Sequence, residues 1–148
     1  MITINYDELT SFAKNMLELV NDKYPAKSKK LMNKAGFALK RIIKKEYNAK
    51  TKKKTGNLLK GVTKGKPYKY HGNTWQIRVF NKAPHAHLLE YGHRFRTIKR
   101  RGWKFTGQYV PGRNIMGSAA ESFYPVFNQM CEEFADEIIE DLAKGQLK

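Results

Sequence analysis

The chain is organised around a central segment that reads KAPHAHLLEYGHR at residues 82–94. Pro84 suits the first turn of a helix, because the N–H that proline lacks would have no partner there. Gly92 suits the position just after a helix end, where the backbone φ angle turns positive. We therefore predict a short helix between these two residues, and its apolar side chains can cover a hydrophobic surface: Leu88, Leu89 and Tyr91.

The length of 148 residues predicts a single domain, 1–148, large enough to bury about 70% of its unfolded surface without a disulfide or a metal. Cys131 is the only cysteine, so neither an intrachain disulfide nor a cysteine zinc site can form. Its place in a helical apolar pattern predicts a buried thiol. We recognise no secretory signal and no apolar run of membrane-spanning length, and therefore expect no membrane partner and cytosol-like surroundings.

The net charge of +16 is concentrated in the middle of the chain. Residues 25–120 hold 25 basic residues and only two acids, Glu46 and Glu90, whereas residues 1–24 and 121–148 are both net acidic. A surface polarised in this way attracts polyanions such as nucleic acid. It also allows the acidic terminal region of one copy to pair with the basic middle of the next, so the charge pattern leaves both kinds of partner open.

Apolar periodicity predicts three helices, which cover residues 7–23, 26–49 and 118–145. Ser118 and Glu121 have the spacing of a capping box at the start of the last helix. Pro125 then either kinks its first turns or moves its start to Ser122. The acids at 132–141 are expected mostly on the outward face, and the apolar stripe is expected to be buried: Phe123, Phe127, Met130, Cys131, Phe134, Ile138, Ile139 and Leu142.

Alternating polar and apolar residues predict a β-hairpin at residues 68–80, which turns at 71–73 and follows a loop at 63–67. Residues 93–113 are predicted either as a long hairpin that turns at Arg101–Gly102 or as a loop that is mobile in the free monomer. The fold class is therefore α+β: a small antiparallel β-sheet packed against a long N-terminal helix region and a C-terminal helix, with a long basic loop. Within the single domain, residues 1–50 are helical, 51–113 are β-rich with basic loops, and 114–148 form the C-terminal helix.

The histidines of the central segment do not have the spacing of a metal site. His85 and His87 lie two positions apart, so on a helix they point away from each other, and no aspartate or cysteine lies nearby. We expect no metal and no cofactor. His87 and Glu90 lie three positions apart and could touch, as a catalytic acid–base pair would require. Alternatively, Glu90 anchors an arginine of the basic segment or of a neighbouring subunit.

The segment 93–113 has the composition of a nucleic-acid-binding surface. It holds seven basic residues and no acid, and Trp103 or Phe105 could stack on bases. No known nucleic-acid-binding module, phosphate-binding loop or nucleophile elbow is recognisable, so we expect no sequence-specific binding. Two alternative functions follow: a monomeric protein that binds nucleic acid without sequence preference, and a small basic ribonuclease.

The order and spacing of several motifs resemble a known family. A long helix runs into a lysine-rich segment and TGNLL at 55–59, a hairpin leads to APHAHLLEYG at 83–92, and PGR at 111–113 precedes the last helix. Over residues 25–145 the chain resembles the tail-component family of long-tailed bacteriophages, the gene-product-ten-like head–tail joining or tail-completion proteins. The chain departs from the family after Gly92, where His93 stands in place of a frequent threonine.

The resemblance implies an α+β fold and a non-enzymatic virion protein that is assembled in the host cytoplasm. Members are thought to form homo-oligomeric rings between the head connector and the tail tube, around the channel that DNA crosses without sequence-specific contacts. The family motif that is expected to have a structural role is Leu89, Glu90, Tyr91 and Gly92. The residues that are expected to face the DNA channel or a partner protein are Lys52, Lys53, Lys54, Arg94, Arg96, Lys99, Arg100, Arg101 and Lys104.

Overall fold

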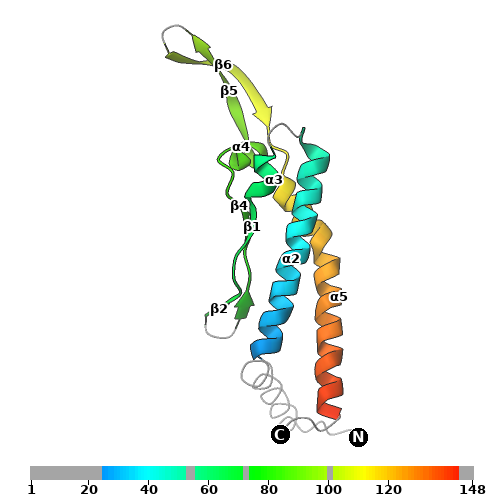
Figure 1. The fold of residues 1–148 in the computed structure, drawn as a ribbon. Helices are drawn as coiled ribbons and strands as arrows, with labels where there is room; N and C mark the ends of the chain where they lie inside the picture. Colours follow the sequence, from blue (N-terminus) through cyan, green and yellow to red (C-terminus); the bar gives the residue numbers. More distant parts are fainter. Residues whose placement is uncertain (1–24, 53–55, 72–73, 100–101, 144–148) are drawn as a thin grey trace, which may run out of the picture.

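The computed structural model describes residues 25–52, 56–71, 74–99 and 102–143. The helix that we predicted at residues 7–23 lies outside this part of the chain. Figure 1 shows an elongated molecule, in which two long helices lie side by side and a β-hairpin extends beyond one end of the pair. The α+β fold class predicted from the sequence is confirmed.

The two long helices are α2, Pro25–Lys50, and α5, Ile115–Ala143, and they run antiparallel (Figure 1). Their opposite directions follow from two contacts. Lys27, near the start of α2, pairs with Asp141 near the end of α5. Lys50, at the end of α2, donates a hydrogen bond of 2.8 Å to the Ser118 hydroxyl in the first turn of α5. The helix predicted at residues 26–49 is thus confirmed as α2.

The start of α5 corrects the prediction of a capping box at Ser118. The helix begins three residues earlier, at Ile115, and the Ser118 hydroxyl donates to the Asn114 carbonyl oxygen at 3.0 Å instead of accepting from a backbone N–H. Pro125 lies inside the helix and does not move its start. The cap of α5 comes from a residue far away in the sequence, which local spacing cannot reveal.

The chain between α2 and the central segment forms an interrupted β-ribbon. After the short helix α3, Asn57–Gly61, strand β1, Val62–Lys64, pairs antiparallel with β4, Val79–Asn81. Farther along the ribbon, β2, Tyr68–Tyr70, pairs antiparallel with β3, Thr74–Gln76. The hairpin predicted from residue 68 is confirmed in β2 and β3. The loop predicted at 63–67 is wrong in its first two residues, which belong to β1.

The ribbon packs closely on α2. A Cβ atom placed on Gly36 of α2 would lie 2.4 Å from Cδ1 of Ile77, between β3 and β4, so a larger residue there would require the side chain of Ile77 to move. The hydrophobic core lies where the second half of α2 meets β1 and the start of α5. Its fully buried residues are Ile43, Tyr47, Val62, Ile115 and Ala119.

The central segment forms α4, Ala86–Tyr91, which follows the turn that contains Pro84. Gly92 has φ 80° and its N–H donates to the Leu88 carbonyl oxygen, so it ends the helix as predicted. The chain then forms β5, Gly92–Lys99, and β6, Gly102–Pro111, an antiparallel hairpin with a bulge between Arg94 and Arg96. The hairpin alternative for residues 93–113 is therefore confirmed. The three strand pairs do not join into one sheet.

The apolar stripe of α5 is only partly buried. Met130 and Ile138 face the core, but Ile139 is 56% exposed, which contradicts the predicted burial. Cys131 is half-buried rather than buried, and burial raises the pKa of its thiol. A two-helix pair covers one side of each helix, so the opposite side of α5 stays in solvent. Within the described part of the chain, no helix combines the length and the apolar character needed to cross a bilayer.

Candidate functional site

The Glu90 carboxylate joins three elements at one point, which we call the junction. It accepts a hydrogen bond of 3.1 Å from the Tyr47 hydroxyl of α2 and one of 3.0 Å from the backbone N–H of Met116 in α5. The first N–H groups of a helix lack partners within it, and a negative charge there also interacts favourably with the helix dipole. Glu90 of α4 therefore caps α5, and no arginine among the described residues is its partner, contrary to one of our predictions.

Tyr47 is the buried partner in the hydrogen bond with Glu90. Its side chain is 0% exposed. Burial, assisted by the negative charge of Glu90, raises the pKa of Tyr47 to about 12, although a hydrogen bond with Asn81 acts in the opposite direction. The hydroxyl therefore keeps its proton across the physiological pH range and remains a donor to Glu90.

Two glycines allow close backbone approaches at the base of the hairpin. A Cβ atom on Gly112 would lie 2.2 Å from the carbonyl oxygen of Glu90, and one on Gly92 would lie 2.5 Å from the carbonyl oxygen of Val110. The N–H of Arg113 donates to the Leu89 carbonyl oxygen at 2.7 Å. The two strands therefore meet closely at their base, and the segment that follows β6 lies against α4.

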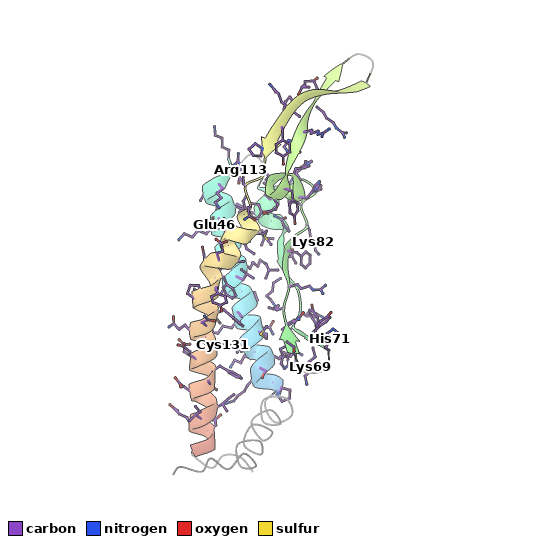
Figure 2. The ribbon with its side chains drawn as sticks, turned by 180° about the vertical axis from the view of Figure 1, so that it is seen from behind. Glu46, Lys69, His71, Lys82, Arg113 and Cys131 are labelled. Atoms are coloured by element: carbon purple, nitrogen blue, oxygen red, sulfur yellow. The ribbon has the colours of Figure 1, made fainter. Side chains whose placement is uncertain are left out.

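Arg113 fastens the junction to the end of α2. Its guanidinium donates to the carbonyl oxygen of Lys50. Figure 2 shows Arg113 close to this end of α2, whereas Lys69 and His71 lie near the opposite end of the molecule. The base of the hairpin is thus attached to the helix pair by side-chain and backbone contacts.

The exposure and contacts of Tyr91 and His87 differ from those predicted from the sequence. Tyr91 is 81% exposed and covers no apolar surface; its contribution is a backbone carbonyl oxygen that accepts a hydrogen bond of 2.8 Å from the Tyr109 hydroxyl. His87 is exposed, and the hydrogen-bond partners of Glu90 are Tyr47 and Met116. The His87–Glu90 pair that a ribonuclease mechanism would use is not formed.

A metal site was not predicted from the histidine spacing. Among residues 25–52, 56–71, 74–99 and 102–143, no three His, Cys, Asp or Glu side chains gather in a group that could hold a metal ion.

The stem of the β5–β6 hairpin carries an exposed cationic and apolar surface. Arg94 and Arg96 are both exposed, and Phe95 between them is 44% exposed. On the paired strand, Tyr109 is 60% exposed. An open hollow of about 670 Å³ lies at the stem, and its lining consists of Leu88, His93, Arg94, Phe95 and Arg96. The structure therefore brings two of the predicted interaction residues, Arg94 and Arg96, onto one projecting element.

The remaining predicted interaction residues are distributed differently. Lys52 follows α2, is exposed, and lines a cavity of about 460 Å³ together with Leu58 and His85. In the backbone of the hairpin, Lys99 ends β5 and Lys104 in β6 pairs with Thr97. Four residues lie outside the described part of the chain: Lys53, Lys54, Arg100 and Arg101.

Along the β-ribbon, cations lie over aromatic rings, a pattern that we did not single out in the sequence. The centroid distances are 4.7 Å for Lys64 on Phe37, 5.6 Å for Lys69 on Trp75, 5.2 Å for Arg78 on Tyr68 and 5.8 Å for Lys82 on Phe80. The alternation of Tyr and Lys at 68–70 could have suggested such pairs. Three of these rings belong to the ribbon and Phe37 belongs to α2, and each can interact favourably with its cation.

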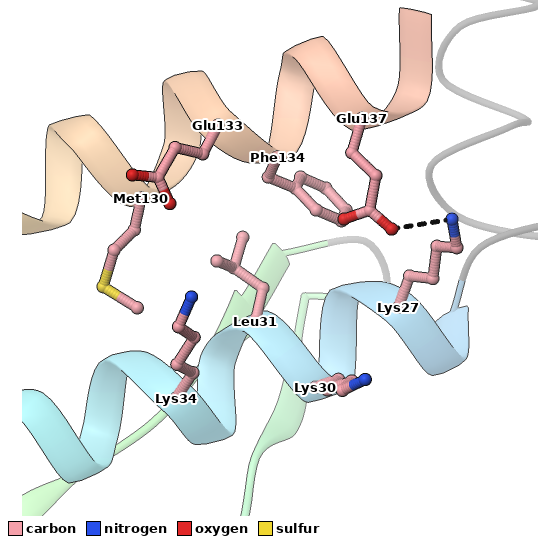
Figure 3. Close-up of a pocket in the computed structure, with 8 residues that line it drawn as sticks. All are labelled: Lys27, Lys30, Leu31, Lys34, Met130, Glu133, Phe134 and Glu137. Atoms are coloured by element: carbon pink, nitrogen blue, oxygen red, sulfur yellow. Dashed lines mark hydrogen bonds and ion pairs between the residues drawn. The ribbon is translucent and has the colours of Figure 1, made fainter. Parts of the chain in front are cut away.

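The acidic residues of helix α5 lie on two of its sides, one toward α2 and one toward solvent. Glu137 and Asp141 turn toward α2, where their oxygens lie 2.9 and 2.5 Å from Nζ of Lys27 and raise the pKa of that lysine. Figure 3 shows the Lys27–Glu137 ion pair at the edge of a pocket of about 260 Å³ between the two helices. Glu132 and Asp136 are exposed and, unlike Glu137 and Asp141, take part in none of the ion pairs among the described residues. The predicted outward orientation of the acids at 132–141 therefore holds for only part of the set.

Comparison with known protein families identifies the family of this chain. Residues 10–92 match the family described as "Bacteriophage HK97-gp10, putative tail-component". The match spans more than half of the chain and ends at Gly92, so it includes the Leu89–Gly92 motif, and the chain belongs to this family. No curated protein and no solved structure matches it. The predicted resemblance is confirmed, and the protein belongs to a family of phage tail components.

Proposed function

We propose that the protein acts at the head–tail interface of a phage or prophage as a tail-completion or head–tail joining protein. It self-associates into a ring and docks on neck and tail-tube proteins around the DNA channel during assembly in the host cytoplasm. The observation that carries this proposal is the projecting basic hairpin, which is joined to the rest of a tail-component protein through one junction. Such an element is suited to reach a neighbouring molecule.

The charge distribution supports a passage for DNA. No acid occurs between Glu90 and Glu121, so the hairpin is cationic along its whole length. A closed ring repeats this charge once per subunit, and the fields add within a narrow channel. Lys52, Arg94 and Arg96 are candidates to face either the channel or an acidic neighbouring protein.

The measurement that tests this function is particle mass as a function of protein concentration, by mass photometry and sedimentation velocity, with and without DNA. We expect discrete closed oligomers without DNA. A strict monomer that binds DNA tightly, with an affinity that falls steeply with salt, would contradict the proposal. That result would favour the second candidate, a monomeric nucleic-acid-binding protein, for which the exposed Arg94, Phe95 and Arg96 are the supporting observation.

A further inference from the structure

The arm, which we define as strands β5 and β6 (residues 92–111), carries exposed cationic and aromatic side chains near its base. Its main contacts are between its two strands and, at its base, with α4. Arg94 and Arg96 stand on either side of the half-exposed Phe95, at the hollow of about 670 Å³. A hollow with an aromatic wall and a cationic rim is complementary to an apolar side chain that is flanked by carboxylates.

The outer face of α5 offers such a group. Glu132, Asp136 and Ile139 are spaced by four and three residues, so they lie on one side of the helix, opposite the buried Met130 and the half-buried Phe134. All three are exposed. Residues 115–143 contain seven acids and no Lys, Arg or His. Among the ion pairs of the described residues, Glu132 and Asp136 take part in none.

The arm does not reach this face of its own α5. Figure 1 shows the arm extending beyond the end of the helix pair at which α5 begins, in the direction opposite to the course of α5. Glu132 lies 17 residues into the helix, which corresponds to about 25 Å along its axis. Contact between the two surfaces therefore requires a second copy of the chain.

We propose that the arm of one copy docks on the outer face of α5 of the next copy. Arg94 and Arg96 lie against Glu132 and Asp136, and Ile139 enters the hollow beside Phe95. This inference rests on the proposed self-association and names its two faces. Because the faces differ, the contact is head-to-tail, which closes into a ring or continues as a filament.

The lengths of the two surfaces agree. The ten residues of β6 extend over about 33 Å, and the segment of α5 from Glu121 to Asp141 spans about 30 Å. One arm can therefore lie along most of the acidic length of one helix. Since the opposed charges are exposed, the association should weaken as the salt concentration rises.

The test is a charge exchange in the full-length chain. Arg94→Glu/Arg96→Glu reverses the charge of the arm, and Glu132→Lys/Asp136→Lys reverses the charge of the outer face of α5. We expect each double variant to raise the concentration needed for self-association by about ten- to a hundredfold, measured by sedimentation velocity. The fourfold variant and an equimolar mixture of the two double variants should both associate again. Lys29→Glu/Lys45→Glu at two exposed positions of α2 is the control, because it changes the net charge as much as the arm variant does.

The outcomes separate this inference from the proposed function. If the wild type forms rings but the fourfold variant and the mixture stay dissociated, the two faces are not partners and the inference is overturned. If the arm variant assembles normally but loses DNA binding, the arm faces nucleic acid, and the inference is equally overturned. If the wild type stays monomeric at every concentration, the proposed function itself fails.

A second measurement does not depend on charge or on the folding of those variants. In a Cys131→Ser background, Phe95→Cys together with Ile139→Cys should form a disulfide between chains under mild oxidation. Each single cysteine variant is the control and should give no comparable ladder of linked oligomers. Absence of the ladder from assembled rings would contradict the docking geometry.

Discussion

The junction and the arm are adjacent in the chain but use their side chains in opposite ways. At the junction, Tyr47 is fully buried, and the Glu90 carboxylate has partners on two helices. Along the arm, Arg94 and Phe95 remain exposed and the strands pair mainly with each other. The contrast teaches that the junction holds buried and hydrogen-bonded groups that stabilise the fold, whereas the arm carries exposed groups that another molecule can contact. Substitutions in the two regions should therefore have different effects on folding and assembly.

The largest effect on folding is expected from Tyr47→Ala. The substitution removes a buried aromatic ring from the core and leaves Glu90 without one of its two partners. Loss of such a ring costs about 3–5 kcal/mol, which is a large share of the stability of a small domain. Urea denaturation followed by circular dichroism measures the change. A loss below about 1 kcal/mol would mean that the junction does not hold the helices together.

Gly112→Ala is expected to have the next largest effect. The added Cβ would lie 2.2 Å from the carbonyl oxygen of Glu90, so the backbone of one of the two segments must move. Overpacking of this kind costs about 1–3 kcal/mol. Gly65→Ala is the matched control, because its Cβ would be no closer than 3.4 Å to Arg78, and its stability should match the wild type. Equal stabilities of the two variants would show that the approach of residues 112 and 90 is not needed.

The pH dependence of stability reports on the protonation of the Tyr47 hydroxyl. Its folded-state pKa of about 12 is higher than the unfolded value of about 10, so between these values the native state keeps a proton that the unfolded state has lost. Stability is therefore complete below pH 10 and falls as pH rises toward 12, by at most about 1.4 kcal/mol per pH unit.

Tyr47→Phe provides the comparison, because other tyrosines and lysines also titrate in this range. The difference in melting temperature between wild type and variant, measured from pH 9 to 12, should shrink as pH rises. A constant difference would show that the hydroxyl titrates as it does in the unfolded chain.

The smallest effect on folding is expected from Phe95→Ala in the arm. The side chain is half-exposed, so the free energy of unfolding should stay within about 0.5 kcal/mol of the wild type. Self-association should nevertheless weaken, since the aromatic wall of the hollow is lost. Denaturation and sedimentation of the same sample check both statements. A variant that is destabilised but assembles normally would reverse the roles assigned to the two regions.

Local signals in the sequence predicted much of the fold. Pro84 and Gly92 bounded α4, periodicity located α2 nearly to the residue, and alternation located the β2–β3 hairpin. Strand β1 was missed because three residues carry almost no pattern, and their partner, β4, begins 15 residues after β1 ends. The start of α5 was misplaced because Ser118 satisfies the local rule for a cap, while the group that caps the helix is Glu90.

The candidate site was predicted less completely than the fold. Composition drew attention to the basic residues of the arm, and family motifs drew attention to Leu89–Gly92, but neither indicated what each side chain contacts. The exposure of Ile139 and the exposed acids beside it depend on which side of α5 meets α2. That choice is made by packing between segments more than 80 residues apart, such as Lys27 and Asp141.

By itself, the sequence determined the class of elements, the concentration of positive charge between two acidic ends, and the family. These properties depend on composition and on spacing within single elements, which a linear pattern records. Only the tertiary structure decided that Glu90 caps α5, that Tyr91 points into solvent, and that the arm extends away from its own acidic helix. Such facts depend on which distant segments share buried surface and hydrogen bonds, and the free energy of those contacts is defined only once the chain has folded.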